Sequence, residues 1–250
     1  MATISSAQTA AVILAGGFGT RIKHLLGDLP KPMAPVNGRP FLEWVVRWLA
    51  AQNVRRVILS TGYLANLIEA HFRSQPVAGV QVTCVPETTP LGTAGGFLNA
   101  VQLSGIKAAV WFLVNGDTLA FADLASALHA LQKETTAGVI FGREVPDTSR
   151  YGSLVTDATG RLECFAEKRP GRGVISTGVY LFRDSLVKQF PTKVPLSLEQ
   201  EVFPALTTSG VSLQVLPMHT PFLDIGTPDT LREADQFIQQ NLPRFQIENV

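Results

Sequence analysis

The stretch Leu14-Ala15-Gly16-Gly17-Phe18-Gly19-Thr20-Arg21 follows a short apolar run over residues 10–14. That run is rich in β-branched residues, which is typical of a buried strand. Three glycines in four positions let the backbone turn sharply and bring its N–H groups close to an anion. Arg21 and Lys31 add two cations suited to phosphate oxygens. The sequence therefore predicts a strand that ends in a phosphate-binding loop.

Two commoner phosphate-binding loops do not fit this stretch. The dinucleotide fingerprint needs a further glycine where Ile22 stands. A P-loop ends in Gly-Lys-Ser or Gly-Lys-Thr, whereas this loop ends in Gly19-Thr20-Arg21. A glycine-rich surface turn without a ligand is the remaining alternative, and the paired Arg21 and Lys31 disfavour it.

The composition is that of a globular protein. The chain has 250 residues, of which 46% are hydrophobic, and a formal net charge of +1. This charge gives no reason to expect a nucleic acid or an anionic membrane as partner. Cys84 and Cys164 are isolated, so we expect buried free thiols rather than a disulfide or a metal site. The N-terminus lacks the pattern of a signal peptide, and we expect a reduced, cytoplasmic protein.

The first half of the chain alternates between strand and helix patterns. Strands are expected at 54–60, 80–85 and 108–114, and helices at 41–52, 65–72 and 93–103. Such alternation predicts an α/β fold with a mostly parallel sheet and helices on both faces. Ligands then gather at the carboxyl ends of the strands.

The second half is richer in short strands. They are expected at 139–141, 153–155, 162–165, 174–182, 211–216 and 222–223. A helix is expected at 197–206, with Ser197 as its cap and Gln200 as the capping partner, and a last helix at 228–240. We interpret this half as a strand-rich extension beside the same core.

Two aspartates follow predicted strands. Asp117 follows the strand 108–114, and Asp224 follows Pro221-Phe222-Leu223. Mg²⁺ typically takes one or two protein carboxylates, with phosphate and water as its other ligands. The pair therefore suits a Mg²⁺-nucleotide site, although aspartates also occur in turns and as helix caps.

These motifs together resemble the signature of the sugar-1-phosphate nucleotidylyltransferases. The glycine loop followed by Lys31-Pro32-Met33 carries the resemblance, and Asn115-Gly116-Asp117 and Asp224-Ile225-Gly226 match the metal-binding motifs of that family. The resemblance implies one GT-A-like nucleotidyltransferase domain over residues 1–250, with a Rossmann-like mixed, mostly parallel sheet. Residues 9–135 would bind the nucleotide, and residues 136–240, with the strand-rich extension, would bind the sugar phosphate.

For the nucleotide half, the resemblance implies catalytic roles for Arg21, Lys31 and Asp117, and Mg²⁺ on Asp117 and Asp224. The implied nucleotide-binding residues are Leu14, Ala15, Gly16, Gly17, Gly19, Thr20, Glu87, Leu91, Gly92, Thr93, Asn115 and Gly116. Guanine presents two adjacent donors to a carboxylate, and Glu87 precedes the turn assigned to the base. Glu87 is therefore expected to favour GTP, unless it is an ordinary loop carboxylate.

For the sugar half, the resemblance places Glu167 on the sugar hydroxyls and Lys168 on the sugar 1-phosphate. Tyr151, Gly152, Thr177 and Gly178 complete this implied pocket. A Glu-Lys pair alone is usually a solvated surface pair. The chain departs from many relatives in having Arg169 between Lys168 and Pro170.

The implied reaction is Mg²⁺-dependent transfer of GMP from GTP to a sugar 1-phosphate, with pyrophosphate as the other product. The resemblance favours D-glycero-α-D-manno-heptose 1-phosphate as acceptor, so that GDP-heptose would serve capsule or lipopolysaccharide synthesis. Mannose 1-phosphate, or a thymidylyl or uridylyl transfer, is the alternative. A non-catalytic nucleotide-sugar-binding subunit is a further one, which the intact Arg21, Lys31, Asp117 and Asp224 disfavour. A homo-oligomer is left open.

Overall fold

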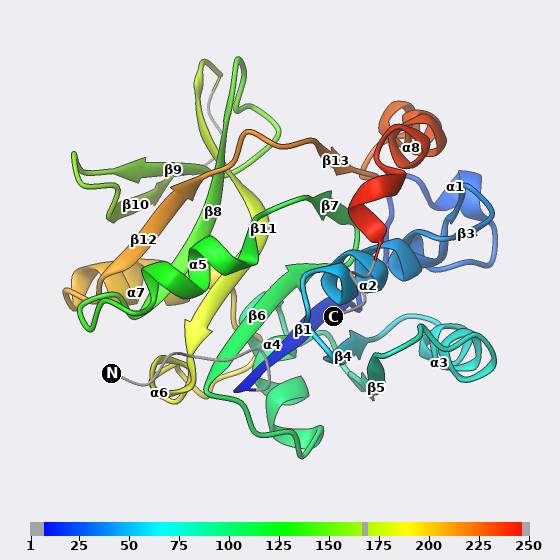
Figure 1. Cartoon of the computed structure of the whole chain (residues 1–250), viewed down its shortest axis with the longest axis horizontal. Coiled ribbons are helices and arrows are strands. Elements are labelled where there is room, and N and C mark those ends of the chain that lie inside the picture. Colours follow the sequence, from blue (N-terminus) through cyan, green and yellow to red (C-terminus); the bar gives the residue numbers. More distant parts are fainter. Residues whose placement is uncertain (1–7, 167–169, 247–250) are drawn as a thin grey trace.

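A nine-stranded sheet forms the centre of the computed structural model, which describes residues 8–166 and 170–246 (Figure 1). Four parallel strands form its first part, in the order β5-β4-β1-β6. They are β1 (Thr9–Ala15), β4 (Arg56–Thr61), β5 (Gln81–Pro86) and β6 (Val110–Asn115). Strand β1 lies between β4 and β6 and is buried almost throughout, because both of its faces are covered. The glycine loop therefore begins at the carboxyl end of a strand that has a neighbour on each side.

The second part of the sheet is mixed. β11 (Gly173–Arg183) pairs antiparallel with both β6 and β8 (Gly138–Val145). β12 (Leu213–Pro217) pairs parallel with β8, so β8 and β12 run in the same direction as the first four strands. β9 (Ser153–Thr156) and β10 (Leu162–Ala166) extend the sheet on the left of Figure 1. The sheet is mixed and mostly parallel, which confirms the predicted fold class.

Helices cover both faces because side chains alternate along each strand. On β1, Ala11 and Ile13 belong to one apolar cluster, whereas Ala10 and Val12 belong to the other. The helices of the first face are α2 (Phe41–Ala51), α3 (Ala65–Ser74), α5 (Leu124–Ala130) and α8 (Pro228–Gln240). Those of the second face are α4 (Thr93–Leu103), α6 (Asp184–Val187) and α7 (Phe203–Thr208).

Short elements lie around the carboxyl ends of the central strands. Three of them are helical: α1 (Lys23–Leu26) and the 3₁₀ turns η2 (Lys31–Met33) and η4 (Leu242–Phe245). The others are two antiparallel strand pairs. In one, β2 (Pro35–Val36) pairs with β3 (Arg39–Pro40), and in the other, β7 (Thr118–Ala120) pairs with β13 (Phe222–Asp224). In the last pair Asp224 lies opposite Thr118, and the Ile225 N–H donates to the Asp117 carbonyl at 3.0 Å. This pairing brings Asp117 close to Asp224, which follows it by about a hundred residues in the sequence.

The segment predicted as one helix over 197–206 differs in detail. It begins as a π-helical turn, η3 (Leu198–Val202), and continues as α7. Ser197 caps it by accepting from the Gln200 N–H at 3.2 Å, but the side chain that reaches back to the Ser197 N–H is Glu201, at 2.9 Å, and not Gln200. A π turn is wider than an α turn, and here the Val202 N–H bonds the Ser197 carbonyl. The wider turn places Glu201, four positions after Ser197, where its carboxylate can accept from the Ser197 N–H.

The cysteines are free, as predicted, but only one is partly buried. Cys84 is half-buried, and burial raises the pKa of its thiol to about 11. Cys164 is exposed, which corrects the prediction, because it lies on the edge strand β10 where the register with β9 shifts, and Glu163 and Cys164 are both left open to solvent. Over the described residues, no helix is long and apolar enough to cross a bilayer.

Candidate active site

A cleft of about 460 Å³ opens beside the glycine loop and the carboxyl ends of β1 and β6. Its lining brings together most of the residues predicted to bind the nucleotide. Those residues are Leu14, Gly16, Gly17, Gly19, Thr20, Arg21, Lys31, Glu87, Leu91, Gly92, Thr93, Asn115 and Asp117. Phe18, Ile22, Pro32, Pro90 and Gly226 also line it, and none of them was predicted individually as a binding residue.

Two of the predicted nucleotide-binding residues lie behind this lining. Ala15 is 1% exposed and its side chain belongs to the core. A Cβ at Gly116 would lie 2.7 Å from the Leu14 carbonyl oxygen, so Gly116 packs against β1. Both residues support the cleft from beneath.

The end of the glycine loop is shaped by Gly19. Its φ of +58° is a conformation that side-chain-bearing residues rarely adopt, and a Cβ there would lie 2.6 Å from the Cβ of Lys31. The absence of a side chain at Gly19 therefore lets η2 pack against the loop. Lys31 reaches the cleft as a result.

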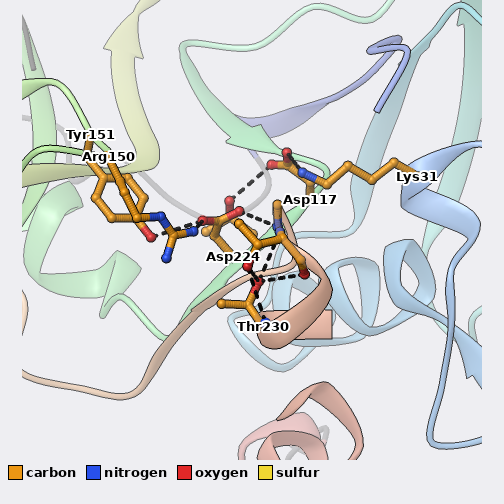
Figure 2. A network of polar contacts seen from close by, with 9 residues as sticks. Lys31, Asp117, Arg150, Tyr151, Asp224 and Thr230 are labelled. Atoms are coloured by element: carbon orange, nitrogen blue, oxygen red, sulfur yellow. Dashed lines mark hydrogen bonds and ion pairs between the residues drawn. The ribbon is translucent and has the colours of Figure 1, made fainter. Parts of the chain in front are cut away.

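Lys31 forms an ion pair with Asp117 across the floor of the cleft (Figure 2). The Nζ–Oδ2 distance is 2.6 Å, and the side chains are 9% and 36% exposed. The Thr118 hydroxyl donates to the other carboxylate oxygen at 3.1 Å. Arg21, by contrast, is exposed and makes no hydrogen bond or ion pair within the described part of the chain. Its guanidinium is therefore available to an anionic ligand.

The turn at residues 90–93 is fixed by a segment about a hundred residues away. The Leu196 N–H donates to the Leu91 carbonyl at 2.8 Å, and the Leu196 carbonyl accepts from the first N–H groups of α4. The Thr93 hydroxyl donates to Glu199 at 3.0 Å and accepts from the Leu198 N–H at 2.8 Å. These contacts hold the wall of the cleft to η3, and no local sequence pattern indicated them.

Glu87 lines the same wall, where its carboxylate already has two donors. The Ser60 hydroxyl donates to Oε1 at 2.8 Å, and the Leu91 N–H donates to Oε2 at 3.2 Å. The carboxylate is thus part of the scaffold of the 90–93 turn. Each of its oxygens retains a further lone pair, so recognition of guanine by Glu87 stays a prediction.

A smaller cleft of about 150 Å³ adjoins the first, and Arg21, Asn115 and Asp117 line both. Its remaining lining residues are Thr118, Arg150, Tyr151, Ser176, Thr177, Gly178, Phe222 and Asp224. Of these, Thr118, Arg150, Ser176 and Phe222 were not predicted as site residues, although Ser176 begins the segment that contains Thr177 and Gly178, and Arg150 directly precedes the Tyr151-Gly152 motif.

The predicted sugar-binding residues fall into different places. Tyr151 and Gly178 line the smaller cleft; Gly178 has φ of +73° and leaves room for the Asn115 side chain. Thr177 also lines it, but its buried hydroxyl donates to the Phe141 carbonyl at 3.0 Å. Gly152 lies against the Phe165 ring and outside both linings. Glu167 and Lys168 lie outside the described residues.

Asp224 is held from three directions and is 15% exposed (Figure 2). The Gly226 N–H donates to Oδ1 at 2.6 Å. The Tyr151 hydroxyl and the Arg150 guanidinium donate to Oδ2 at 3.0 and 3.4 Å. Burial, together with the charge of Asp224, raises the pKa of Tyr151 to about 12. The phenol therefore remains a hydrogen-bond donor to Asp224 at neutral pH.

The chemistry of Asp117 and Asp224 suits Mg²⁺. Both carboxylates line the smaller cleft, next to the larger one. Across the described residues, no group of three or more His, Cys, Asp or Glu side chains is placed so that it could hold a metal ion. A pair of carboxylates beside a phosphate site fits Mg²⁺, because this ion keeps several positions for water and phosphate oxygens.

Residues 10–241 match the family model described as nucleotidyl transferase. This chain belongs to the nucleotidyl transferase family. That family is an enzyme family, and the match confirms the resemblance drawn from the glycine loop and the aspartate motifs.

Similar proteins include sugar-1-phosphate guanylyltransferases. The chain is 35% identical to the mannose-1-phosphate guanylyltransferase of Mycobacterium tuberculosis, over 89% of this chain and 62% of that protein. It is 30% identical to the D-glycero-alpha-D-manno-heptose 1-phosphate guanylyltransferase of Campylobacter jejuni, over 88% of this chain and 95% of that protein. The chain thus spans less than two thirds of the Mycobacterium relative.

A solved structure shares the fold. The crystal structure of HddC from Yersinia pseudotuberculosis complexed with GMP-PN superposes with a TM-score of 0.79, at 34% identity. The match covers 91% of this chain and 98% of that one.

Proposed function

We propose that this chain transfers GMP from GTP to a sugar 1-phosphate and releases pyrophosphate. The observation that carries the proposal is the pair of adjoining clefts that share Arg21, Asn115 and Asp117. The larger cleft, beside the glycine loop, is assigned to the nucleotide. The smaller one is assigned to the sugar phosphate, and the shared residues are assigned to the reacting phosphates.

The choice of guanine is supported by the relatives and by one wall of the cleft. The Mycobacterium and Campylobacter relatives are both named guanylyltransferases. Glu87 and the residues of the 90–93 turn line the cleft in which the base would lie. Thymidylyl or uridylyl transfer is the alternative.

For the acceptor we propose D-glycero-α-D-manno-heptose 1-phosphate. The Campylobacter relative, matched over 95% of its own length, carries that name. Mannose 1-phosphate is the second candidate, because the Mycobacterium relative has the higher identity of 35%. Synthesis of GDP-heptose for surface polysaccharides and a cytoplasmic location belong to the same proposal.

In the proposed mechanism no protein nucleophile is needed. An oxygen of the sugar 1-phosphate attacks the α-phosphorus in line, and pyrophosphate leaves. Arg21 and Lys31 bind the triphosphate and stabilise the charge that develops in the transition state. Asp117 and Asp224 would hold Mg²⁺, which neutralises phosphate charge when bound. Catalysis then consists of positioning and charge neutralisation.

The two halves of the chain would divide the substrates between them. Residues 9–135 supply the glycine loop and the 90–93 turn, and are assigned to GTP. Residues 136–240 supply Tyr151, Thr177 and Gly178, and are assigned to the sugar phosphate together with Glu167 and Lys168. Asp224 belongs to the second half but would hold the metal beside Asp117.

A pyrophosphate-release assay tests the proposal. GTP, UTP, dTTP and ATP are each combined with heptose 1-phosphate or mannose 1-phosphate, and the nucleotide sugar is identified by mass. We expect rapid turnover with GTP and heptose 1-phosphate, and slower turnover with mannose 1-phosphate. Preference for dTTP or UTP would contradict the guanylyl assignment, and preference for mannose 1-phosphate would replace the acceptor.

A further inference from the structure

Each of the two aspartates assigned to the metal is paired with a cation of the protein itself (Figure 2). Lys31 pairs with Asp117 at 2.6 Å, and Arg150 pairs with Asp224 at 3.4 Å. Lys31 is already assigned to the triphosphate. Arg150 has no assigned role, although it lines the smaller cleft.

The contact between Arg150 and Asp224 is a loose one. The Arg150 side chain is 45% exposed, and its Nη2–Oδ2 distance of 3.4 Å is long for a charge-assisted hydrogen bond. Its guanidinium also lies 5.3 Å from the centre of the Tyr151 ring. Partly exposed pairs of this kind contribute little to stability, so Arg150 can leave Asp224 at small cost.

Asp224 does not depend on Arg150 for its position. The Gly226 N–H holds Oδ1 at 2.6 Å, and the Tyr151 hydroxyl holds Oδ2 at 3.0 Å. When Arg150 moves away, the carboxylate therefore keeps its orientation and regains an uncompensated negative charge, which a divalent cation can neutralise.

The surroundings of Arg150 suit a phosphate group. Arg21 lines the same cleft as a second guanidinium. Thr118, Tyr151 and Ser176 also line it, but their hydroxyls already donate to Asp117, Asp224 and Tyr180. A guanidinium binds phosphate oxygens in a bidentate manner. Once a divalent cation neutralises Asp224, Arg150 is a free positive charge in a small polar cleft of about 150 Å³.

We propose that Arg150 is an exchangeable counterion that occupies Asp224 until a divalent cation binds there, and then binds the phosphate of the acceptor sugar phosphate. The inference rests on the proposed function, since it assigns the smaller cleft to that substrate. It makes Arg150 a binding residue for the acceptor and couples acceptor affinity to the divalent cation.

The test uses Arg150→Met and two binding measurements that do not depend on turnover. Mn²⁺ affinity is measured by electron paramagnetic resonance, with no sugar phosphate and with saturating α,β-methylene GTP, in which the bond that the reaction breaks is replaced by a stable P–C bond. Mannose 1-phosphate affinity is measured by calorimetry at saturating Mn²⁺ and analogue. Loss of the competing cation should tighten Mn²⁺ binding about threefold. Loss of the phosphate ligand should weaken mannose 1-phosphate binding about tenfold.

Two further variants make the result specific. Arg150→Lys retains the charge, so its Mn²⁺ affinity should return toward that of the wild type. Arg172→Met removes another exposed arginine of the same half, which pairs with Glu144 at 2.7 Å and lines neither cleft. It should change neither affinity, and thermal unfolding of each variant confirms that the fold is intact.

Unchanged or weaker Mn²⁺ binding in Arg150→Met, or unchanged mannose 1-phosphate binding, would overturn the inference. A wild type that still forms GDP-sugar would then leave the proposed function standing. If the wild type binds both ligands but forms no nucleotide sugar with any acceptor, the proposed function fails instead.

Discussion

The ion pair of Lys31 and Asp117 joins a nearly buried amine to a partly exposed carboxylate. A buried cation without a partner is costly, so Lys31 needs Asp117 whenever the cleft holds no ligand. When phosphates enter, they can replace Asp117 as the partner of Lys31, and Asp117 becomes available to a cation. The same two residues thus account for the stability of the empty cleft and for the proposed chemistry.

Asp117→Asn should reduce turnover at least about a hundredfold, because an amide is a poor ligand for Mg²⁺ beside phosphate. The free energy of unfolding should fall by about 1–2 kcal/mol, because Lys31 loses its partner. Steady-state kinetics and urea unfolding measure the two effects. Asp229→Asn, which breaks an exposed pair with Arg232, is the control. Turnover near that of the wild type at limiting Mg²⁺ would rule out the metal-ligand role.

Arg21→Met should slow the reaction at saturating substrates. The activation free energy should rise by about 3 kcal/mol, on the scale of a lost oxyanion donor. The unfolding of this variant should not change, because Arg21 makes no hydrogen bond or ion pair within residues 8–166 and 170–246. Lys23→Met removes a nearby cation that lies over the Tyr63 ring and lines neither cleft, so its rate should not change. An effect confined to the affinity for sugar phosphate would contradict the assignment of Arg21.

At the level of elements, the 90–93 turn and η3 form one unit. Thr93 begins α4 and bonds both Glu199 and the Leu198 N–H. The N–H groups of Ala94 and Gly95 share the Leu196 carbonyl, which satisfies donors that every helix start leaves free. The shape of the nucleotide cleft therefore depends on a segment that does not line it.

Thr93→Val keeps the volume of this side chain but removes both hydrogen bonds. We expect the KM for GTP to rise about tenfold, with little change in the KM for the sugar phosphate, because two of the hydrogen bonds that hold the turn are lost. Thr93→Ser retains the hydroxyl and should behave as the wild type. Equal changes in the KM for GTP and the KM for the sugar phosphate would contradict the assignment of Thr93 to the nucleotide side of the site.

A second unit joins α2 to α3 through Glu43, which is 1% exposed. Arg39 and Arg47 contact its Oε1 at 2.7 and 2.8 Å, and the His71 ring contacts its Oε2 at 2.8 Å. Burial alone would raise the pKa of Glu43, but the hydrogen bonds from Arg47, His71 and Arg39 outweigh it and hold the pKa below its usual value. The ionised form is therefore favoured by folding.

The lowered pKa predicts an acid-sensitive contribution to stability. A carboxylate with a depressed pKa stabilises the fold above its unfolded pKa, about 4.5 for Glu43, and this stability is lost as pH falls through the folded value. Glu43→Gln should lower the free energy of unfolding by about 1–3 kcal/mol at pH 7 and flatten its decline below about pH 4.5. Glu69→Gln, in an exposed pair with Arg73, is the control and should change both by little. If the free energy of unfolding of Glu43→Gln falls below pH 4.5 as steeply as that of the wild type, other carboxylates control the acid sensitivity.

At the level of the whole molecule, local patterns predicted what local physics determines. The apolar run at 10–14 and the glycines behind it give a buried central strand and a loop at its carboxyl end, as predicted. Hydrophobic periodicity also placed α2, α3, α4 and α8 to within a few residues. These features depend on side chains that are close in sequence.

The long-range features could not be predicted in this way. The pairing of β7 with β13, which places Asp224 beside Asp117, joins segments about a hundred residues apart, and their aspartates were grouped only through the family resemblance. Arg150 was missed because its meaning comes from Asp224, and the role of Glu87 in the scaffold comes from Ser60 and Leu91. A local sequence pattern does not show which distant residue each of these side chains contacts.

The central claim, transfer of a whole nucleotidyl group to a sugar 1-phosphate, is tested most directly by following labelled phosphorus. The wild type is incubated with heptose 1-phosphate and with GTP labelled at either the α- or the γ-phosphorus, and the products are separated. We expect the α-label in GDP-sugar and the γ-label in pyrophosphate, both only when the sugar phosphate is present. Release of the γ-label as orthophosphate, with the α-label left in free GDP, would contradict the central claim.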